Sequence, residues 1–266
     1  MVYKVGKREQ AELFLQNHAT SRFFPETIPY SLENLKSFLE RHELVFAKMD
    51  TTGQGRGIIR ITRQPSGGYA YVGYTVVGDR LEGQVKHVEE LHPILHPFAS
   101  LGRTYDYILQ QGVRSITPGG QYVLVRSHVQ FIDGAWIVGG MFGNIGQQDD
   151  GVVNRNRGAD IVLVEDLLMN YMKFDEMKAR QVMQEMEHRS IITAQVMAGP
   201  YPCREYGIDI GLDANGQPWI FEVNTTPGIR AFATMDFSVW QRIVDNRKYQ
   251  ARQNQNPDTI NGNTSE

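Results

Sequence analysis

Two acids and one amide near the C-terminal end of the chain are spaced so that they can share one oxygen-rich site. Asp209 lies in one run of alternating apolar and polar residues, and Glu222 and Asn224 lie in the next run. The dipeptide Asn215-Gly216 between the runs predicts a two-residue type I′ hairpin. Such a turn places Asp209 directly opposite Glu222, with Asn224 on the same face of the sheet.

Like charges that face each other on a sheet repel, so this arrangement needs a chemical cause. Either one carboxyl keeps its proton, or a divalent cation lies between the two. An all-oxygen set of so few ligands suits magnesium, which takes its other ligands from water and from phosphates. The alternative is an exposed hairpin with scattered acids. The opposite face is apolar and is predicted to enter a core; it consists of Ile208, Ile210, Leu212, Trp219, Phe221 and Val223.

A glycine-rich loop at residues 50–57 joins two predicted strands, residues 44–48 and 58–62. Glycines at alternate positions let the backbone approach a ligand and present N–H groups to an anion. Because a strand follows the loop, and the Gly-Lys-Ser/Thr ending is absent, the loop is not a P-loop. Lys48 before the loop and Arg56 within it favour a flap that covers phosphates; the alternative is a flexible hairpin tip. The three glycines are Gly53, Gly55 and Gly57.

Composition bounds the class of protein. The chain has 266 residues, 41% of them hydrophobic, which is enough for a large core. A net charge of −3 gives no electrostatic case for nucleic acid or an anionic membrane as partner. The single cysteine, Cys203, fits a reducing compartment, and no signal segment or membrane-spanning run is evident. We therefore expect a cytoplasmic protein without nucleic-acid or membrane partners.

The remaining sequence predicts an α+β fold. Helices are expected at residues 8–17 and 31–41, and residues 165–197 are expected to form either one helix or two with a break. A second hairpin is expected at residues 122–142, with Asp133-Gly134 as its type I′ turn.

Assembled in this order, the parts resemble the ATP-grasp superfamily, most closely its YheC/YheD-like, endospore coat-associated group, from about Gly6 to Phe237. In the D-alanine–D-alanine ligase-like members, an Asp on one strand and a Glu-x-Asn-x-x-Pro-Gly element on the next hold two magnesium ions. Asp209 and Glu222-Val-Asn-Thr-Thr-Pro-Gly228 look like that set, with Glu222 as the bridging ligand and manganese as the alternative metal.

The resemblance implies two α+β lobes that hold ATP and magnesium between antiparallel sheets. The ATP-grasp domain would span residues 1–242, with a small lobe at about 44–108 that carries the flap and a large lobe at about 109–242 that carries the metal site. The polar residues 246–266 would form a disordered tail.

The resemblance also implies binding roles for individual residues. Lys7 and Lys48 look like the two nucleotide-binding lysines. The triphosphate flap would consist of Gly53, Gln54, Gly55, Arg56 and Gly57, and the adenine-binding hinge of Gln110, Gln111, Gly112 and Val113. The catalytic residues near the γ-phosphate would be Arg126, Asn154 and Arg157.

The chain departs from the group's pattern at positions close to these residues. Leu124 stands where the group usually has the Asp of Asp-x-Arg, Asn144 where it has an Arg, and Gly158-Ala159 where it has Gly-Gly. The resemblance also begins near the start of the chain, whereas relatives commonly have a further N-terminal domain that helps to bind the carboxylate acceptor. Nucleotide and metal binding are therefore expected to carry over better than ligase activity.

Three functions use such a site. The first is an ATP-dependent ligase, in which a small-molecule or peptide carboxylate becomes an acyl phosphate that an amine captures. Two magnesium ions would clamp the phosphates, while Lys48, Arg126 and Arg157 stabilise charge. The second is a degenerate nucleotide-binding module with a structural or regulatory role, for instance in the spore coat. The third is phosphoryl transfer to a small molecule.

Overall fold

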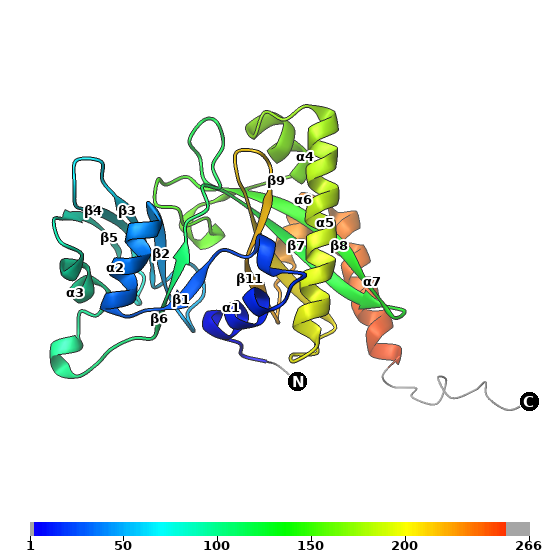
Figure 1. The fold of residues 1–266 in the computed structure, drawn as a ribbon. Coiled ribbons are helices and arrows are strands. Elements are labelled where there is room, and N and C mark those ends of the chain that lie inside the picture. Colours follow the sequence, from blue (N-terminus) through cyan, green and yellow to red (C-terminus); the bar gives the residue numbers. More distant parts are fainter. Residues whose placement is uncertain (1–2, 254–266) are drawn as a thin grey trace, which may run out of the picture.

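Two antiparallel sheets and the helices that cover them make up the fold of the computed structural model, which describes residues 3–253 (Figure 1). The first sheet has six strands in the order β1-β6-β2-β3-β4-β5. They are β1 (Thr27–Pro29), β2 (Leu44–Met49), β3 (Ile58–Arg63), β4 (Tyr69–Tyr74), β5 (Arg80–Val85) and β6 (Tyr107–Gln111). The second sheet has five strands in the order β11-β10-β7-β8-β9. They are β7 (Val123–Ile132), β8 (Ala135–Ile145), β9 (Asp160–Val162), β10 (Glu205–Leu212) and β11 (Pro218–Asn224). The α+β class expected from the sequence is confirmed.

The helices divide between the two sheets. They are α1 (Lys7–Gln16), α2 (Leu32–Arg41), α3 (Leu91–Leu95), α4 (Val164–Asp166), α5 (Glu176–Ala198), α6 (Arg230–Met235) and α7 (Phe237–Gln253). Ser31 caps α2 and Asp175 caps α5, each by accepting a hydrogen bond from a backbone N–H in the first turn. Of the two possibilities for residues 165–197, the structure has the interrupted one, since a π-helical turn at Leu167–Tyr171 precedes α5.

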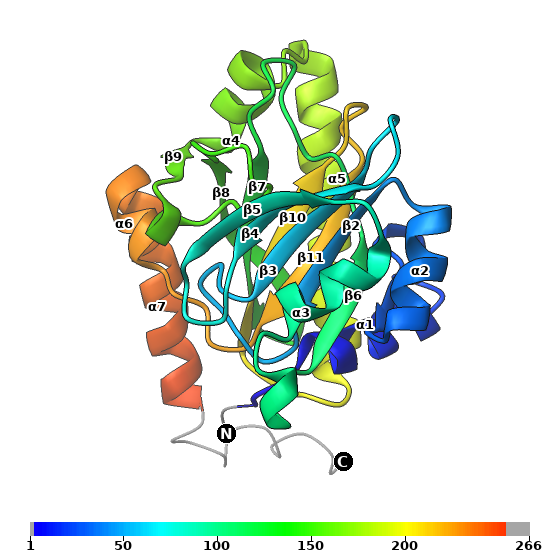
Figure 2. The same ribbon diagram turned by 90° about the vertical axis from the view of Figure 1, so that its left-hand side faces the viewer.

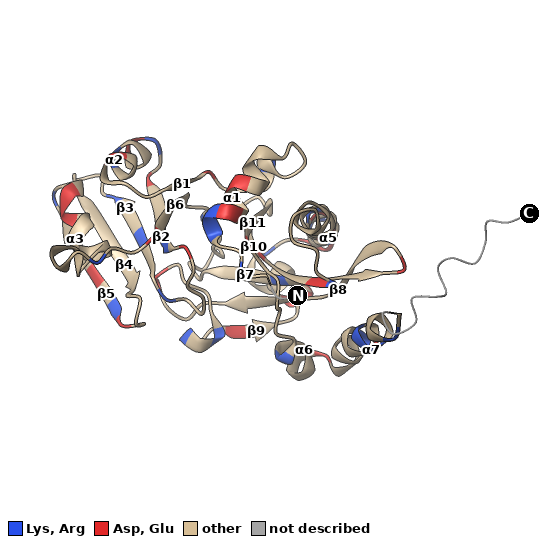
Figure 3. Ribbon diagram, turned by 90° about the horizontal axis from the view of Figure 1, so that it is seen from below, with Lys and Arg blue, Asp and Glu red and all other residues tan. Residues whose placement is uncertain are grey.

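Each sheet buries one face and leaves the other available for a site. In β2, Val45 and Ala47 point into a core with α2 and α3, so the alternate side chains Phe46 and Lys48 point the other way. In the five-stranded sheet, α1 and α5 cover the face that carries the buried apolar residues of β10. Helices α6 and α7 lie against part of the opposite face, as Figure 3 shows from below.

The Asp133-Gly134 turn between β7 and β8 is confirmed, because both residues have positive φ, 49° and 81°. The turn predicted between β10 and β11 is wrong. Residues 214–216 form a three-residue loop, closed by a hydrogen bond from Asp213 N to Gln217 O (3.1 Å), and only Gly216 has a positive φ, 77°.

The extra loop residue changes the register close to the turn, where Leu212 pairs with Pro218. A β-bulge between residues 209 and 210 then restores the predicted pairing of Asp209 with Glu222. The same bulge reverses part of the predicted apolar face. Ile220 is buried in the core, whereas Phe221 turns toward the cleft between the sheets.

The C-terminal helix corrects another expectation. Because α7 continues to Gln253, residues 246–253 of the predicted disordered tail are helical, and residues 254–266 lie outside the described part of the chain. Within residues 3–253, none of the helices has both the length and the hydrophobicity that a membrane crossing requires.

A partly buried carboxylate fixes α7 to the five-stranded sheet. Glu205 of β10 accepts hydrogen bonds from Arg247 Nε (2.9 Å) and Arg247 Nη2 (2.6 Å) of α7, and His128 Nε2 of β7 lies 3.1 Å away. Burial alone would raise the pKa of Glu205, but the hydrogen bonds and charges of His128 and Arg247 lower it from 4.5 to about 2.

We expect Glu205→Gln to lower the free energy of unfolding by about 1–2 kcal/mol at pH 7, because Arg247, whose side chain is 35% exposed, loses its counter-charge. The folded-state pKa is depressed, so this stabilisation is complete above pH 4.5 and is lost as the pH falls toward 2. Urea unfolding of the wild type and the variant at several pH values measures both effects. Exposed Glu187→Gln is the matched control, and equal stabilities of the wild type and Glu205→Gln at pH 7 would contradict the expectation.

Candidate active site

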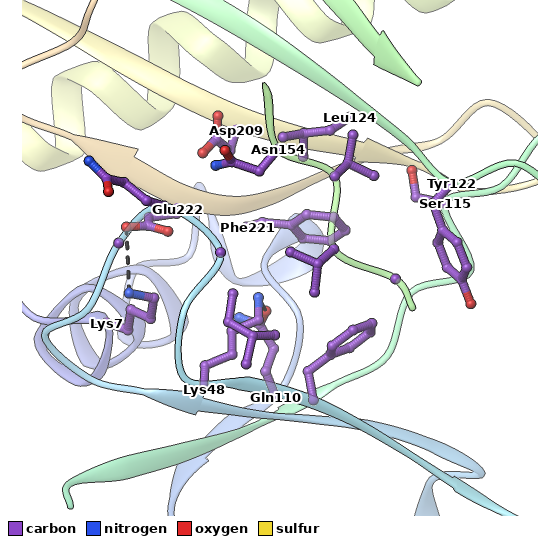
Figure 4. A pocket seen from close by; sticks show the side chains of 18 of the residues that line it. Lys7, Lys48, Gln110, Ser115, Tyr122, Leu124, Asn154, Asp209, Phe221 and Glu222 are labelled. Carbon is purple, nitrogen blue, oxygen red and sulfur yellow. Dashed lines mark hydrogen bonds and ion pairs between the residues drawn. The ribbon is translucent and has the colours of Figure 1, made fainter. Parts of the chain in front are cut away.

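A cleft between the two sheets collects most of the side chains with reactive or ligand-binding chemistry. Lys48 of β2 and Gln110 of β6 enter it from the six-stranded sheet, and Asp209 of β10 and Glu222 of β11 enter it from the five-stranded sheet. Figure 4 shows the two groups facing each other across the cleft. The cavity has a volume of about 180 Å³.

The acidic side of the cleft is held by charge pairing. Arg126 of β7 lies opposite Asp209 in the sheet and donates two hydrogen bonds to it, Nε–Oδ1 at 2.6 Å and Nη2–Oδ2 at 3.1 Å. Burial would lower the pKa of Arg126, but the charge and hydrogen bonds of Asp209 raise it. Asn224 Nδ2 lies 3.4 Å from Asp209 Oδ2. The side chains of Arg126, Asp209 and Asn224 therefore share one face of the sheet, as was expected for Asp209 and Asn224.

Glu222 faces a lysine from the start of α1. Lys7 Nζ lies 3.7 Å from Glu222 Oε1 (dashed line in Figure 4) and donates a hydrogen bond to Thr52 O at 2.6 Å. Thr52 belongs to the loop between β2 and β3. Lys7 therefore connects the acidic strand β11 to the glycine-rich loop of the other sheet.

Lys48 lies in the opposite wall, and no carboxylate of residues 3–253 forms an ion pair with it. Its Nζ donates a hydrogen bond to Gln110 Oε1 at 2.5 Å and lies 5.7 Å and 5.4 Å from the ring centroids of Phe46 and Phe221. Burial lowers the pKa of Lys48 from 10.5 to about 8, although the charge of Glu222 acts in the opposite direction. An anion that enters the cleft would stabilise the charged form of this buried lysine.

The glycine-rich loop lines the cleft with only part of its length. Gly53, Gln54 and Gly55 line the cavity, and the positive φ of Gln54 (62°) and Gly55 (71°) turns the backbone toward it. Arg56 is exposed outside the cavity, and Gly57 packs instead against the end of β2, where a Cβ would lie 2.8 Å from Met49 Cβ. The expectation that these two residues bind nucleotide is not matched by their position.

The predicted hinge is divided in the same way. Gln110 and Val113 line the cavity. The Gln111 side chain accepts a hydrogen bond from Glu26 N at 3.3 Å, and Gly112 N donates to Leu44 O at 2.8 Å. These two polar groups are therefore already used in contacts with neighbouring segments. Any role of these two residues in binding adenine would have to come from the polar groups that these hydrogen bonds leave unused.

The three residues predicted to be catalytic do not all meet. Arg126 and Asn154 line the cleft, but Arg157 does not. The Arg157 guanidinium lies 3.7 Å from the centroid of the Tyr74 ring, donates to Gly78 O at 3.0 Å and reaches Gly55 O at 3.5 Å. In this structure Arg157 therefore contacts the glycine-rich loop from outside the cleft, and its role beside the transferred phosphate stays a prediction.

We expect Arg157→Ala to expose the glycine-rich loop, because the loop loses its contact at Gly55. Trypsin should then cleave after the exposed Arg56 about tenfold faster, and mass spectrometry of the N-terminal fragment measures the rate. The control is Arg103→Ala, which removes an exposed arginine far from the loop in sequence. Equal cleavage of Arg157→Ala and the wild type would show that Arg157 does not hold the loop.

Several residues of the cleft were missed by the sequence reasoning. They are Phe46, Thr52, Ile58, Ser115, Tyr122, Val123, Gly151, Val152, Val153 and Phe221. For Phe46 the signal was present, because it alternates with the core residues of its strand. For Phe221 it was not, because the bulge that turns it toward the cleft leaves no evident mark in the sequence. The absence of a side chain at Gly211 makes room for its ring, since a Cβ there would lie 2.2 Å from Phe221 Cζ.

The oxygen set fits a hard cation only if further ligands come from a bound molecule. Asp209, Glu222 and Asn224 provide oxygen atoms on one side of the cleft, which suits magnesium. Within residues 3–253, however, no cluster of three or more His, Cys, Asp or Glu residues is arranged to hold a metal ion. Arg126 and Lys7 already neutralise the two carboxylates. Phosphate oxygens could supply the missing ligands, and they would also attract these two cations.

Comparison with known proteins shows the family and the fold of the chain. The family model for YheC/D like ATP-grasp proteins matches residues 4–249. The endospore coat-associated protein YheD of Bacillus subtilis is 22% identical over 227 residues, which are 84% of this chain and 48% of YheD. The chain thus spans about half the length of this relative.

Two solved structures resemble the fold at low sequence identity. The D-cycloserine synthetase DcsG gives a TM-score of 0.54 at 12% identity, covering 93% of this chain and 70% of that one. The biotin carboxylase domain of the Hydrogenobacter thermophilus 2-oxoglutarate carboxylase, in complex with MgADP and bicarbonate, gives 0.51 at 15%, covering 90% and 44%. The chain therefore has the ATP-grasp fold and belongs to the YheC/D-like ATP-grasp family.

Proposed function

We propose that the protein binds ATP with magnesium in the cleft and is a carboxylate–amine ligase that works through an acyl phosphate. The observation that carries the proposal is the arrangement of Asp209, Glu222 and Asn224 on one wall, opposite Lys48 on the other. Oxygen ligands for a hard cation and a buried ammonium for phosphate oxygens are the two requirements of a magnesium–nucleotide site. Membership in the family supports the same reading.

Each wall has a distinct part in binding. Lys48 and Lys7 would contact phosphate oxygens, and the backbone N–H groups at Gly53 and Gly55 would cover them. The acidic wall would hold magnesium, or manganese as the alternative, and the metal would neutralise phosphate charge. A second ion would need Glu222 as a shared ligand.

The reaction itself needs little covalent work from the protein. An oxygen of the acceptor carboxylate attacks the γ-phosphorus, the bond from that phosphorus to the bridging oxygen breaks, and ADP leaves. An amine then attacks the carbonyl carbon of the acyl phosphate, the carbon–oxygen bond breaks, phosphate leaves, and the amine proton passes to solvent. Arg126 and Asn154, which line the cleft next to Asp209, would stabilise the charge on the transferred group.

A second candidate is a nucleotide-binding module that does not turn ATP over. Arg126 is engaged by Asp209 through two hydrogen bonds, which leaves it less free to stabilise a transferred phosphoryl group. Leu124 and Asn144, at positions where the group usually has charged residues, favour the same reading. Since YheD is described as endospore coat-associated, a role in the spore coat belongs to this candidate.

The deciding experiment measures release of ADP and phosphate by the full chain with magnesium–ATP and pooled carboxylates, amino acids and amines. The ligase reading expects release that requires both a carboxylate and an amine. Release with a carboxylate alone would indicate phosphoryl transfer. Thermal stabilisation by millimolar magnesium–ATP without any release would favour the binding module, and no stabilisation would contradict both.

A further inference from the structure

A second cavity, of about 370 Å³, opens beside the cleft. It shares Leu124, Arg126, Asn154 and Asp209 with the cleft, so a molecule that fills it would reach the acidic wall. Its outer wall includes two further arginines, which the family resemblance assigns no role: Arg155 and Arg230.

The charge of this cavity is opposite to that of the chain. Three arginines and one aspartate line it, whereas acids outnumber Lys and Arg by 30 to 27 in the whole sequence. Arg126 is neutralised by Asp209 through its two hydrogen bonds. The other two, Arg155 and Arg230, have no carboxylate within 4.0 Å among residues 3–253 and donate no side-chain hydrogen bond there. Their guanidinium groups are exposed and free to bind an anion.

The positions of these two arginines are fixed by packed elements. Arg155 begins the short 3-10 turn Arg155–Arg157 that precedes β9, and Arg230 is the first residue of α6. Ile161 of β9 packs in one apolar cluster with Phe232 of α6. Figure 2 shows β9 and α6 side by side at the edge of the five-stranded sheet, so both arginines are held at the same edge.

We propose that this cavity binds the acceptor, and that Arg155 and Arg230 hold a second oxyanion of it. The proposal rests on the proposed ligase function, because it places the carboxylate that reacts beside Arg126 and Asn154. A guanidinium group binds a carboxylate or a phosphate through two parallel N–H donors, so either group satisfies the site. The acceptor is then a diacid, an acidic peptide or a phosphorylated carboxylate, and not a simple monocarboxylic acid.

The other walls of the cavity are compatible with such a ligand. Leu124 and Asn144 stand where the group usually has an Asp and an Arg, so these two positions add no charge, and the charged pair on the inner wall is Arg126 with Asp209. Asn144 Nδ2 donates a hydrogen bond to Leu124 O at 3.2 Å, so the side-chain oxygen of Asn144, an acceptor that does not bind anions, is the group left for a ligand. The cationic binding therefore shifts outward, to Arg155 and Arg230.

Calorimetric titration of the full chain with three capped dipeptides tests the proposal. Ac-Glu-Glu-NH2 offers two carboxylates, Ac-Glu-Ser(P)-NH2 a carboxylate and a phosphate, and Ac-Glu-Gln-NH2 one carboxylate at matched size. Titrations are done with and without magnesium and a non-hydrolysable ATP analogue. We expect the wild type to bind at least one doubly anionic peptide about tenfold more tightly than Ac-Glu-Gln-NH2, the effect of one charge-assisted contact.

The double variant Arg155→Gln plus Arg230→Gln should lose this preference and keep the affinity for the ATP analogue. Arg103→Gln is the matched control and should keep both. Equal binding of all three peptides by the wild type, or an unchanged preference in the double variant, overturns the acceptor assignment while leaving nucleotide binding and ADP release in place. If the wild type binds no ATP analogue, the proposed function fails, and the titrations without nucleotide still decide on the arginine pair. The phosphoserine peptide distinguishes a phosphate from a carboxylate as the second group.

Discussion

Replacing Glu222 with glutamine is expected to abolish ATP turnover, with a loss of at least a hundredfold, on the order of that seen when a charged transition-state contact is removed. Glutamine keeps the shape of the side chain but removes one negative charge from the acidic wall. Two carboxylates and one carboxamide are too few to hold two cations unless one carboxylate is shared, and Glu222 is the candidate for that role. The affinity for magnesium–ATP should fall as well, because the acidic wall then keeps only one charged oxygen ligand for the metal.

The measurement combines ADP release with magnesium titrations of ATP affinity. In Glu222→Gln, raising the magnesium concentration should recover part of the ATP affinity and none of the turnover. Glu187→Gln, on an exposed part of α5, is the control for loss of one negative charge and should behave as the wild type. If Glu222→Gln binds ATP with unchanged magnesium dependence, Glu222 is not a metal ligand, and the acidic wall has another purpose.

The acidic wall could be predicted from the sequence although the turn that was used to predict it was wrong. A two-residue turn and a three-residue loop followed by a bulge give the same pairing of Asp209 with Glu222, because the bulge cancels the extra loop residue. The alternation of polar and apolar residues beyond the bulge was strong enough to fix the face of both acids. The side chains between the turn and the bulge had no such support, and Trp219 and Phe221 were therefore assigned to the core incorrectly.

Contacts between segments far apart in the sequence were harder to predict. Arg157 was expected beside the phosphate because of its motif, yet Tyr74 and the carbonyl oxygen of Gly78 hold it behind the loop. Tyr74 is itself fixed by a hydrogen bond to Asp150 Oδ2 at 2.7 Å. Local spacing carries no information on such a chain of partners, because its members come from β4, the following turn and the loop before β9. The strand β5 was also missed, although its residues alternate between exposed and half-buried positions; it is a six-residue edge strand that pairs with β4.

Lys48→Met is expected to weaken magnesium–ATP binding by about 10- to 100-fold, the range for losing a hydrogen bond to a charged group. Methionine has a similar length and no charge, so the contacts with Phe46 and Phe221 are largely kept. Wild-type affinity should also fall as the pH rises above 8, because only the protonated lysine attracts phosphate and its pKa is about 8. The variant should show no such pH dependence.

The lowered pKa of Lys48 has opposite effects on ATP affinity and on the stability of the free protein as the pH rises. Its folded-state pKa, about 8, lies below the unfolded value of 10.5, so between these pH values the unfolded chain binds more protons. The free energy of unfolding of the wild type should therefore rise with pH in this window, by about 1 kcal/mol per pH unit, relative to Lys48→Met. Denaturant unfolding from pH 7 to 10.5 measures this, with exposed Lys86→Met as control. A wild type that loses ATP affinity above pH 8 and gains stability over the same window would identify Lys48 as the group responsible for both. Parallel stability curves for the wild type and Lys48→Met would mean that its ammonium is better solvated than its position between two aromatic rings suggests.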